Sequence, residues 1–491
     1  MNEIRLDKNK IECFKGEFLH PSLDVKNNVA ILGFRFIAKD LKEKEIFIAT
    51  MGENIAIHQD NHFEFENKRY FIEIKGRLLA RIEERWDLEN LFTFIEGYNS
   101  AKLNALYPKK IFEEIKGLSK KYIELEKEED YSLITSWIIG TYLFPIFSAY
   151  PFLHIKAPKQ SGKSQCLNFL KQLCFNAVKA KPSLPALSDT VDSLRGTYLI
   201  DQADVLKRKG SEELMEILTD SYKKEGGKRR IRFSEKRGGW KTIEQETYSP
   251  KAFASVGELS EDLADRCLTI PLIKSKKNFP EPSEESDDWK EIRGNLYKTF
   301  LTQFSLLKSS YEVFKIHYRQ NSEIIGRDLE LWLPMETILK LNTEEKELNQ
   351  LRKRFRQLYG YTEYEPSELE KEAIKSVYDS FDEKEAVLLR PQEIRERINE
   401  DAWEDKCLTL HQKDIRIGYI IKKFNLSSEK KTTNKGVAYL FEKEKVEKIN
   451  NLYCKDENNT SLSSLSAESS ENTDKNPEKI SENSNATNTP Q

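Results

Sequence analysis

One octapeptide, Ala157–Ser164 (Ala-Pro-Lys-Gln-Ser-Gly-Lys-Ser), limits the possible folds of this chain more than any other stretch. The apolar run Phe152–Ile155 precedes it, and apolar residues recur at helical spacing in Gln165–Cys174, which follows it. Such a loop between a strand and a helix places backbone N–H groups at the helix N-terminus, where phosphate charge is stabilised. The sequence therefore predicts a P-loop on an α/β sheet. The alternative is a helical protein with a chance Gly-Lys-Ser.

The side chains of this loop predict ATP and Mg²⁺ as its ligands. Lys163 is expected to reach the β- and γ-phosphates, and the Ser164 hydroxyl is expected to ligate Mg²⁺. Ala157 stands where the motif prefers glycine. The expected nucleotide-binding residues of the loop are Ala157, Pro158, Lys159, Gln160, Ser161, Gly162, Lys163, Ser164 and Gln165.

A second, acidic element that would hold Mg²⁺ follows the apolar strand Thr197–Ile200. Asp201 comes directly after this strand and is the expected metal ligand beside Ser164. The next residue is Gln202, where the usual pattern has a glutamate that polarises the attacking water. An amide orients water but cannot accept its proton. Either Asp204 is a substitute base, or Gln202 positions the water itself.

Composition narrows the class of protein. The net charge of −3 over 491 residues gives no global attraction to nucleic acid, so any such attraction must be local. The six cysteines form no C-x-x-C pair, which argues against a zinc ribbon or a disulfide framework. We expect reduced cysteines in a cytoplasmic protein, and the N-terminus lacks the apolar segment of a signal peptide.

The segment Ser132–Ile155 contains no Asp, Glu, Lys or Arg over 24 residues, which is long enough for a membrane span. Gly140, Pro145 and Pro151 interrupt it, and its last residues have to supply the strand before the P-loop. We therefore expect a helix buried against the sheet and no membrane association.

The chain divides into six predicted segments. The first 100 residues alternate as β-strands do and carry no recognisable chemistry. The last segment is too polar to bury a core, so it is expected to be disordered. The predicted segments are 1–100, a β-rich accessory domain; 101–149, a helical linker; 150–275, the P-loop core; 276–365, a helical lid; 366–453, a winged-helix-like domain; and 454–491, the tail.

Taken in order, five segments resemble the AAA+/superfamily 3-type ATPases of phages, plasmids and integrated elements, which are often replication-associated helicases. The segments are Tyr150–Ile155, the P-loop at 157–164, Gly196–Asp204, Tyr248–Ser255 and Asp262–Cys267. The resemblance covers about 110–445. It implies an α/β P-loop NTPase core with a parallel sheet, and ATP sites between the subunits of a homo-oligomeric ring. Ala157 and Gln202 depart from the commonest pattern.

Three further site residues follow from this resemblance. Ser255, near the polar end of a core strand, would sense the γ-phosphate. Arg266 would act as an arginine finger on the nucleotide of a neighbouring subunit, although an isolated Asp-Arg pair is most often a surface ion pair. Arg327 would suit a second sensor supplied by the helical lid.

The segment Tyr222–Lys241 is locally basic, with nine Lys or Arg against two Glu. Paired glycines punctuate it and Ile231–Phe233 predicts a hairpin strand. The resemblance places this segment toward a central pore, where it would grip single-stranded DNA; the alternative is a solvated basic loop. The candidate contacts are Lys228, Arg229, Arg230, Arg232, Lys236 and Arg237.

Residues 366–453 predict three helices, a basic turn at Lys430–Gly436 and a strand, which is the pattern of a winged helix. Its candidate DNA contacts are Lys422, Lys423, Lys430 and Lys431. Because winged helices also serve as docking modules for other proteins, two functions stay open for this segment, DNA binding and protein docking.

These features together predict an ATP-dependent DNA motor, a replicative helicase-like ATPase of a mobile genetic element. The alternative is an ATP-binding switch or assembly scaffold with little hydrolysis. Gln202 favours the switch, whereas the basic segment and the winged-helix pattern favour the motor.

Overall fold

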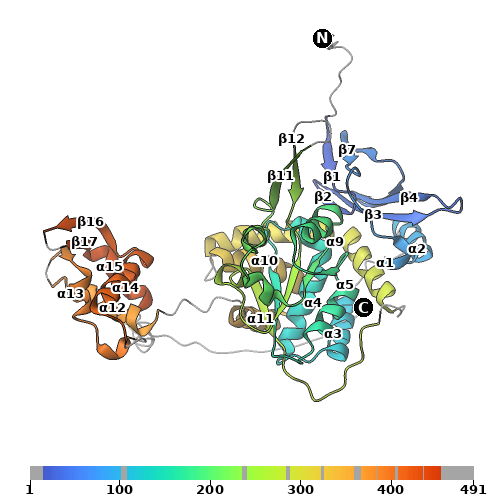
Figure 1. Cartoon of the computed structure of the whole chain (residues 1–491). Helices are drawn as coiled ribbons and strands as arrows, with labels where there is room; N and C mark the ends of the chain where they lie inside the picture. Colours follow the sequence, from blue (N-terminus) through green and yellow to red (C-terminus); the bar gives the residue numbers. More distant parts are fainter. Residues whose placement is uncertain are drawn as a thin grey trace, which may run out of the picture. The chain divides into compact units, whose positions relative to one another are not determined.

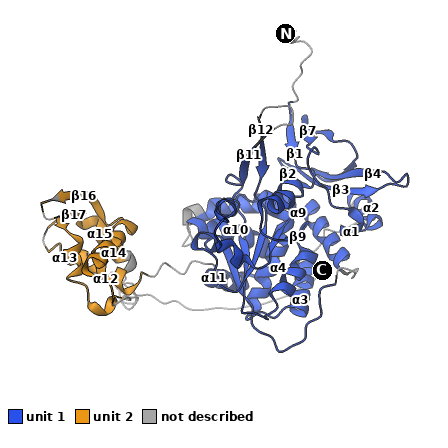
Figure 2. Ribbon diagram, viewed as in Figure 1, with its two compact units in different colours: residues 1–362 blue, residues 363–491 orange. Residues whose placement is uncertain are grey.

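The computed structural model describes residues 15–100, 108–234, 240–283, 288–321, 326–358, 366–382, 384–403, 407–434 and 436–454. The chain forms two compact units, Met1–Thr362 and Glu363–Gln491 (Figure 2). The predicted tail beyond residue 454 lies outside the described residues, as does Cys13.

A five-stranded parallel sheet forms the centre of the first unit (Figure 1). Its strands follow the order β14-β8-β13-β10-β9, so β13 lies between the strand that leads into the P-loop and the strand that leads into Asp201. The central strands β8, β13 and β10 are buried almost throughout, as expected for a parallel sheet covered on both faces, whereas the edge strand β9 is half-buried. The α/β core with a parallel sheet is thereby confirmed. The strands are β8 (Phe152–Lys156), β9 (Val178–Ala180), β10 (Tyr198–Ile200), β13 (Lys251–Ser255) and β14 (Cys267–Pro271).

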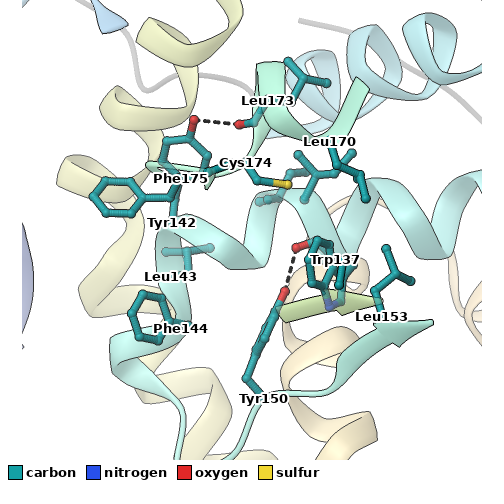
Figure 3. Close-up of a cluster of buried hydrophobic side chains, with 14 of the residues drawn as sticks. Trp137, Tyr142, Leu143, Phe144, Tyr150, Leu153, Leu170, Leu173, Cys174 and Phe175 are labelled. Carbon is teal, nitrogen blue, oxygen red and sulfur yellow. Dashed lines mark hydrogen bonds between the residues drawn. The ribbon is translucent and has the colours of Figure 1, made fainter. Parts of the chain in front are cut away.

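The uncharged segment before the P-loop is a buried helix, as predicted. Helix α4 (Glu128–Leu143) is buried almost throughout from Asp130 onward. Gly140 lets Tyr150 approach this helix, because a Cβ there would lie 2.0 Å from the tyrosine oxygen. Tyr150 Oη donates to the carbonyl of Trp137 at 2.6 Å (Figure 3). No helix among the described residues has the length and apolar character needed to cross a bilayer.

The helices that cover the sheet come both before and after α4 in the sequence. The bidentate ion pair of Arg354 with Asp130, at 2.6 and 2.8 Å, ties α11 to α4 in the protein interior. Tyr142 Oη donates to the carbonyl of Leu173 at 2.7 Å and so ties α4 to the end of α5 (Figure 3). The remaining elements of this part are α3 (Pro108–Tyr122), η2 (Phe144–Ile146), α5 (Lys163–Leu173), α6 (Leu184–Ser188), η3 (Asp189–Ser193), η4 (Ala203–Lys207), α7 (Glu212–Asp220), β11 (Lys228–Ser234), β12 (Trp240–Glu246), α8 (Glu261–Ala264), α9 (Asp288–Asn321), α10 (Gly326–Leu339) and α11 (Glu345–Leu358).

The N-terminal β-rich segment packs part of its apolar residues into the hydrophobic core of the P-loop core and gathers the others in a small core of its own. Phe34 of β3 meets Tyr297 of α9 edge to face, with ring centroids 5.3 Å apart. Thr50 of β4 donates to the carbonyl of Leu301 at 2.8 Å. The two sheets have the orders β2-β3-β4-β5 and β1-β7-β6. The elements are β1 (Glu17–Leu19), β2 (Leu23–Lys26), β3 (Val29–Ile37), β4 (Glu43–Met51), β5 (Asn54–His58), β6 (His62–Phe65), β7 (Lys68–Ile72), α1 (Ile82–Arg85) and α2 (Leu88–Asn99).

The second unit has its own hydrophobic core and a three-stranded sheet of order β15-β17-β16. Thr409 caps α14 as predicted, through a reciprocal pair of hydrogen bonds with Gln412. Lys430 and Lys431 were predicted in a turn, but they lie in β16, because that strand pairs with β17 as far as Thr433. The elements are α12 (Glu368–Tyr378), β15 (Ala386–Leu389), α13 (Pro391–Arg395), η5 (Glu400–Ala402), α14 (Leu410–Lys423), β16 (Ser427–Thr433), β17 (Gly436–Glu442) and α15 (Lys443–Tyr453).

Candidate functional site

The loop between β8 and α5 has the backbone conformation that a phosphate cradle needs. Gln160 and Gly162 have φ values of 61° and 80°, in the left-handed region that glycine adopts most easily. Ala157 is buried, has no positive φ, and donates its N–H to the carbonyl of Ser255 at 3.3 Å. Alanine therefore fits at position 157 without strain. The Ser161 hydroxyl is buried and has no hydrogen-bond partner among the described residues, which leaves it available to a bound oxyanion.

The two predicted Mg²⁺ ligands meet at the carboxyl edge of the sheet. Ser164 Oγ donates to Asp201 Oδ2 at 3.0 Å, although β13 separates the strands that position them. A hydroxyl and a carboxylate are hard oxygen ligands, which suit Mg²⁺ when phosphate oxygens and water complete its shell. The residues present thus fit a magnesium–nucleotide complex.

Lys163 lies across the loop at the start of α5. Its Nζ donates to the carbonyls of Ala157 and Pro158 at 2.7 and 2.5 Å. Partial burial lowers the pKa of Lys163, while the nearby carboxylates of Asp204 and Asp201 act in the opposite direction. The ammonium group is therefore held at the loop, and phosphate oxygens can replace the two carbonyls as its acceptors.

Lys179 is a site residue that the sequence analysis missed. It lies on β9, next to β10, and its Nζ is 3.2 Å from Asp201 Oδ2, the same oxygen that accepts the Ser164 bond. Its Nζ also donates to Asn168 Oδ1 at 3.2 Å. The tripeptide Val178-Lys179-Ala180 has no recognisable motif, and only strand pairing brings the lysine to the site.

The two candidates for activating water differ in their surroundings. Gln202 is exposed, and its backbone N–H donates to Asp201 Oδ1 at 3.0 Å with φ at 57°. Asp204 accepts the N–H groups of Val256 and Gly257 at 3.0 and 3.1 Å. Burial raises the pKa of Asp204, but those two hydrogen bonds, the residue's own N–H and the charge of Lys207 together hold the pKa below its usual value. Asp204 is an anion that anchors the loop after β13, which argues against its predicted role as a substitute base.

Ser255 lies inside the sheet and is 1% exposed. Its Oγ donates to the carbonyl of Gly257 at 2.6 Å and lies 2.7 Å from His154 Nε2. The other ring nitrogen of His154 lies 3.2 Å from Thr269 Oγ1. In this arrangement the serine hydroxyl is already satisfied, so sensing a phosphate would require it to leave these partners.

Acidification is expected to destabilise the first unit through His154. Burial lowers the pKa of this imidazole to about 4, whereas an unfolded histidine titrates near 6.5. The unfolded chain therefore takes up the proton first, so stability is complete above about pH 6.5 and falls as the pH approaches 4. The expected loss is on the order of 3 kcal/mol, at about 1.4 kcal/mol per pKa unit.

The variant His154→Gln tests this assignment because glutamine does not titrate. Its urea midpoint should change less between pH 6.5 and 4 than that of the wild type, with His20 supplying the remaining dependence because burial lowers its pKa to about 3. Equal pH dependence in the two proteins would contradict the assignment.

A hollow opens beside the P-loop. Gln165, at the start of α5, donates to the carbonyls of Tyr122 and Pro280 at 2.9 and 3.0 Å and so connects two of its walls. The sequence analysis did not foresee these walls, because they come from segments far from the P-loop in the chain. The lining residues are Tyr122, Ile123, Glu124, Gln160, Ser161, Gly162, Gln165, Leu272, Ile273, Ser275, Lys277, Asn278 and Phe279.

Arg266 and Arg327 lie together, but away from the P-loop of their own chain. Arg266 precedes β14, which runs parallel to β8 with Cys267 opposite Phe152 and Pro271 opposite Lys156. The P-loop follows the other end of β8. Helix α10 brings Arg327, the residue predicted as a second sensor, to the same edge as Arg266. Its role as a sensor stays a prediction.

The basic segment forms the predicted hairpin, labelled β11 and β12 in Figure 1. Acidic neighbours partly neutralise it: Glu244 lies 2.7 Å from Lys228 and 3.4 Å from Arg230, and Glu213 of α7 lies 2.6 Å from Arg229. The side chain of Arg230 is 80% exposed and that of Lys228 is 57% exposed. Arg232 is exposed on the same strand, whereas Lys236 and Arg237 lie outside the described residues.

In the second unit, the four lysines that were predicted to contact DNA are exposed, and two of them form ion pairs within the unit. Lys423 pairs with Glu370 at 2.9 Å, and Lys431 lies 3.2 Å from Glu429. Lys422 and Lys430 are also exposed. Helix α14 also presents three large apolar side chains to solvent, Leu410, Ile415 and Tyr419.

Comparison with known proteins gives structural neighbours only. No family model and no curated protein matches the sequence. Similar solved structures include the SCCmec type IV Cch active helicase (TM-score 0.34, 10% identity, 85% of this chain and 94% of that one). They also include a full-length MCM homolog from Methanopyrus kandleri (0.32, 12%, 67% and 77%) and the apo C-terminal region of NrS-1 (0.29, 8%, 84% and 96%). These scores and identities are low, and the function proposed below rests on the site itself.

Proposed function

We propose that this chain is an ATP-dependent motor on DNA, a replicative helicase-like ATPase of a mobile genetic element that works as a homo-oligomeric ring. The contact that carries the proposal is the 3.0 Å hydrogen bond from Ser164 to Asp201. It joins the hydroxyl of the P-loop to the carboxylate of another strand, which is the pair that binds Mg²⁺ in P-loop NTPases. Few structural roles need this combination beside an unpartnered buried hydroxyl such as that of Ser161.

Each part of a nucleoside triphosphate has a place at this site. The phosphates would lie over the loop at 157–162, where the first turn of α5 presents N–H groups that have no partner within the helix. Lys163 would turn from its two carbonyl partners to the β- and γ-phosphates. The hollow lined by Tyr122–Glu124 and by residues after β14 would take the base and ribose.

Hydrolysis would depend on a water molecule held by Gln202, because Asp204 is already bonded to two N–H groups. An amide orients this water, and charge developing on the phosphate is then stabilised by Lys163, by Mg²⁺ and by Arg266 of a neighbouring subunit. Because an amide cannot accept the proton of the attacking water, Gln202 favours the second candidate function, an ATP-binding switch with little turnover.

The DNA-binding proposal rests on the β11–β12 hairpin. It leaves the sheet immediately before β13 begins, and so lies at the edge opposite the P-loop. Lys228 and Arg230 are exposed there and are held by a single glutamate, Glu244. We propose that DNA phosphates replace this glutamate as the partner of both cations. The second unit, predicted to be a winged helix, would contact duplex DNA through Lys422 and Lys430.

The double variant Lys228→Glu/Arg230→Glu tests the hairpin. It is expected to abolish stimulation of ATP hydrolysis by single-stranded DNA and to weaken binding of a labelled oligonucleotide at least about tenfold, since each lost phosphate contact also reduces the salt dependence of binding. Binding of a fluorescent ATP analogue should be unchanged. The matched control is Lys109→Glu, which reverses an exposed charge on α3. Full stimulation in the double variant would overturn the hairpin assignment.

A further inference from the structure

Two protein groups hold the carboxylate oxygen that is expected to bind Mg²⁺. Asp201 Oδ2 accepts the hydroxyl of Ser164 at 3.0 Å, and the ammonium group of Lys179 lies 3.2 Å from the same oxygen. The other carboxylate oxygen, Oδ1, accepts the backbone N–H of Gln202 at 3.0 Å. Mg²⁺ needs oxygen ligands, and Lys179 cannot supply one because an ammonium group has donors only. Lys179 and Mg²⁺ therefore compete for one atom.

The sheet and helix α5 together set the position of Lys179. Its strand, β9, pairs with β10 so that Lys179 lies opposite Leu199, two residues before Asp201. On the other side, Asn168 Oδ1 of α5 accepts a second hydrogen bond from the ammonium group at 3.2 Å. The ammonium group therefore keeps one protein partner when Asp201 turns to a metal ion.

Partial burial and charge balance both strengthen this competition. The side chain of Lys179 is 26% exposed and that of Asp201 is 27% exposed, and salt screens partly buried charges less than exposed ones. The two cations Lys163 and Lys179 match the two anions Asp201 and Asp204. A free divalent cation thus meets no net attraction from these four side chains, whereas a nucleoside triphosphate brings negative charge of its own.

We propose that Lys179 makes Mg²⁺ binding conditional on the nucleotide. Its ammonium group competes with free Mg²⁺ for Asp201 Oδ2, and it gives way toward Asn168 only when phosphates bring the metal ion with them. Lys179 is thus a positioning residue that acts through Asp201. The inference rests on the proposed function, in which Asp201 and Ser164 hold the metal ion, and it implies that the site releases Mg²⁺ once the phosphates leave.

Titration of the full chain with Mn²⁺ alone, without nucleotide, tests the competition. Mn²⁺ takes the same oxygen ligands as Mg²⁺, and electron paramagnetic resonance counts the free ion. Lys179→Met removes the charge and should bind Mn²⁺ at least about tenfold more tightly than the wild type, the scale on which neighbours of metal ligands change metal affinity. Lys179→Arg keeps the charge and should resemble the wild type. Unchanged or weaker binding by Lys179→Met, or equally tight binding by both variants, overturns the proposal.

Two further variants locate the effect. The double variant Lys179→Met/Asp201→Asn should lose the gain, because it also removes the carboxylate for which the lysine competes. A gain that persists in the double variant places the ion elsewhere and overturns the proposal. Lys109→Met removes the same charge from an exposed side chain of α3 and should change Mn²⁺ binding less than about twofold. An equal gain in Lys109→Met would be an effect of net charge alone and would contradict the competition.

A second measurement separates this inference from the proposed function. The Kd of a fluorescent ATP analogue is measured with EDTA and with Mg²⁺, and the ratio of the two values reports how much Mg²⁺ strengthens nucleotide binding. This ratio should rise about tenfold in Lys179→Met, because the metal ion no longer displaces a cation. An unchanged ratio overturns the role of Lys179 and leaves the nucleotide site standing. If the wild type binds the analogue under neither condition, the proposed function fails, whereas the Mn²⁺ titration still measures the competition at Asp201.

Discussion

Replacing Lys163 with alanine is expected to lower ATP hydrolysis by about 10²–10³-fold, because the variant removes a preorganised positive charge from the phosphates as negative charge develops on them. The lysine Nζ lies at the mouth of the loop, bound only to the carbonyls of Ala157 and Pro158. Nothing else in the described loop supplies a charge at that point except the exposed Lys159. Phosphate release measures the loss of hydrolysis, and a fluorescent ATP analogue measures nucleotide binding.

Lys109→Ala is the matched control for this experiment. It removes the same charge from an exposed side chain of α3, outside the nucleotide site, and it should change hydrolysis less than about threefold, within the range of exposed electrostatic contacts. A Lys163→Ala protein that hydrolyses ATP as fast as the control would show that the loop at 157–164 is not the site of the reaction.

The variant Arg195→Ala is expected to destabilise the first unit by about 3–5 kcal/mol, because it leaves buried carboxylates without a counter-charge. Arg195 Nη1 donates to Asp24 Oδ1 at 2.8 Å, and its Nε and Nη2 donate to Glu246 at 2.9–3.0 Å. Burial raises the pKa of Asp24, but Arg195 and the N–H of His20 outweigh it and hold the pKa below its usual value. Denaturant unfolding followed by tryptophan fluorescence measures the loss.

Arg230→Ala provides the comparison for Arg195. Both arginines pair with a glutamate of β12, Glu244 in one case and Glu246 in the other, but Arg230 is 80% exposed and Arg195 is 9% exposed. The exposed pair is expected to contribute less than about 1 kcal/mol to the free energy of unfolding. Equal unfolding midpoints for the two variants would contradict a buried ionic cluster at this position.

This cluster also ties the N-terminal β-sheets to the rest of the first unit. Asp24 belongs to β2 and Glu246 to the end of β12, so Arg195 joins the first sheet to the base of the basic hairpin. Arg77 reinforces the junction by pairing with Asp192. The alternation of residues 1–100 predicts strands correctly, but it contains no information on the surface against which they pack.

The features that sequence analysis predicted well are local. The P-loop, the strand before Asp201, the hairpin at 228–246 and the buried helix α4 each follow from a short pattern of residue types. Their mutual placement follows from one further rule, that the carboxyl ends of parallel strands lie at one edge of a sheet. That rule brings Asp201 to Ser164 without any sequence signal between them.

The features that sequence analysis missed depend on distant packing. Lys179 reaches Asp201 only because β9 pairs with β10. The hollow beside the P-loop takes one wall from α3 and another from the chain after β14. Arg327 lies beside Tyr222 because α10 packs at the amino edge, and the motif order alone does not give this placement. The winged-helix identity of the second unit stays a prediction.

Continuous phosphate release from Mg²⁺–ATP, measured with and without single-stranded DNA, tests the central proposal most directly. If the chain is a motor, each protomer turns over ATP many times and the rate rises several-fold with DNA, while Asp201→Asn is inactive. If ATP binds but each protomer releases at most one phosphate, with no response to DNA, the chain is the switch that Gln202 and the bonded Asp204 favour, and the motor is contradicted.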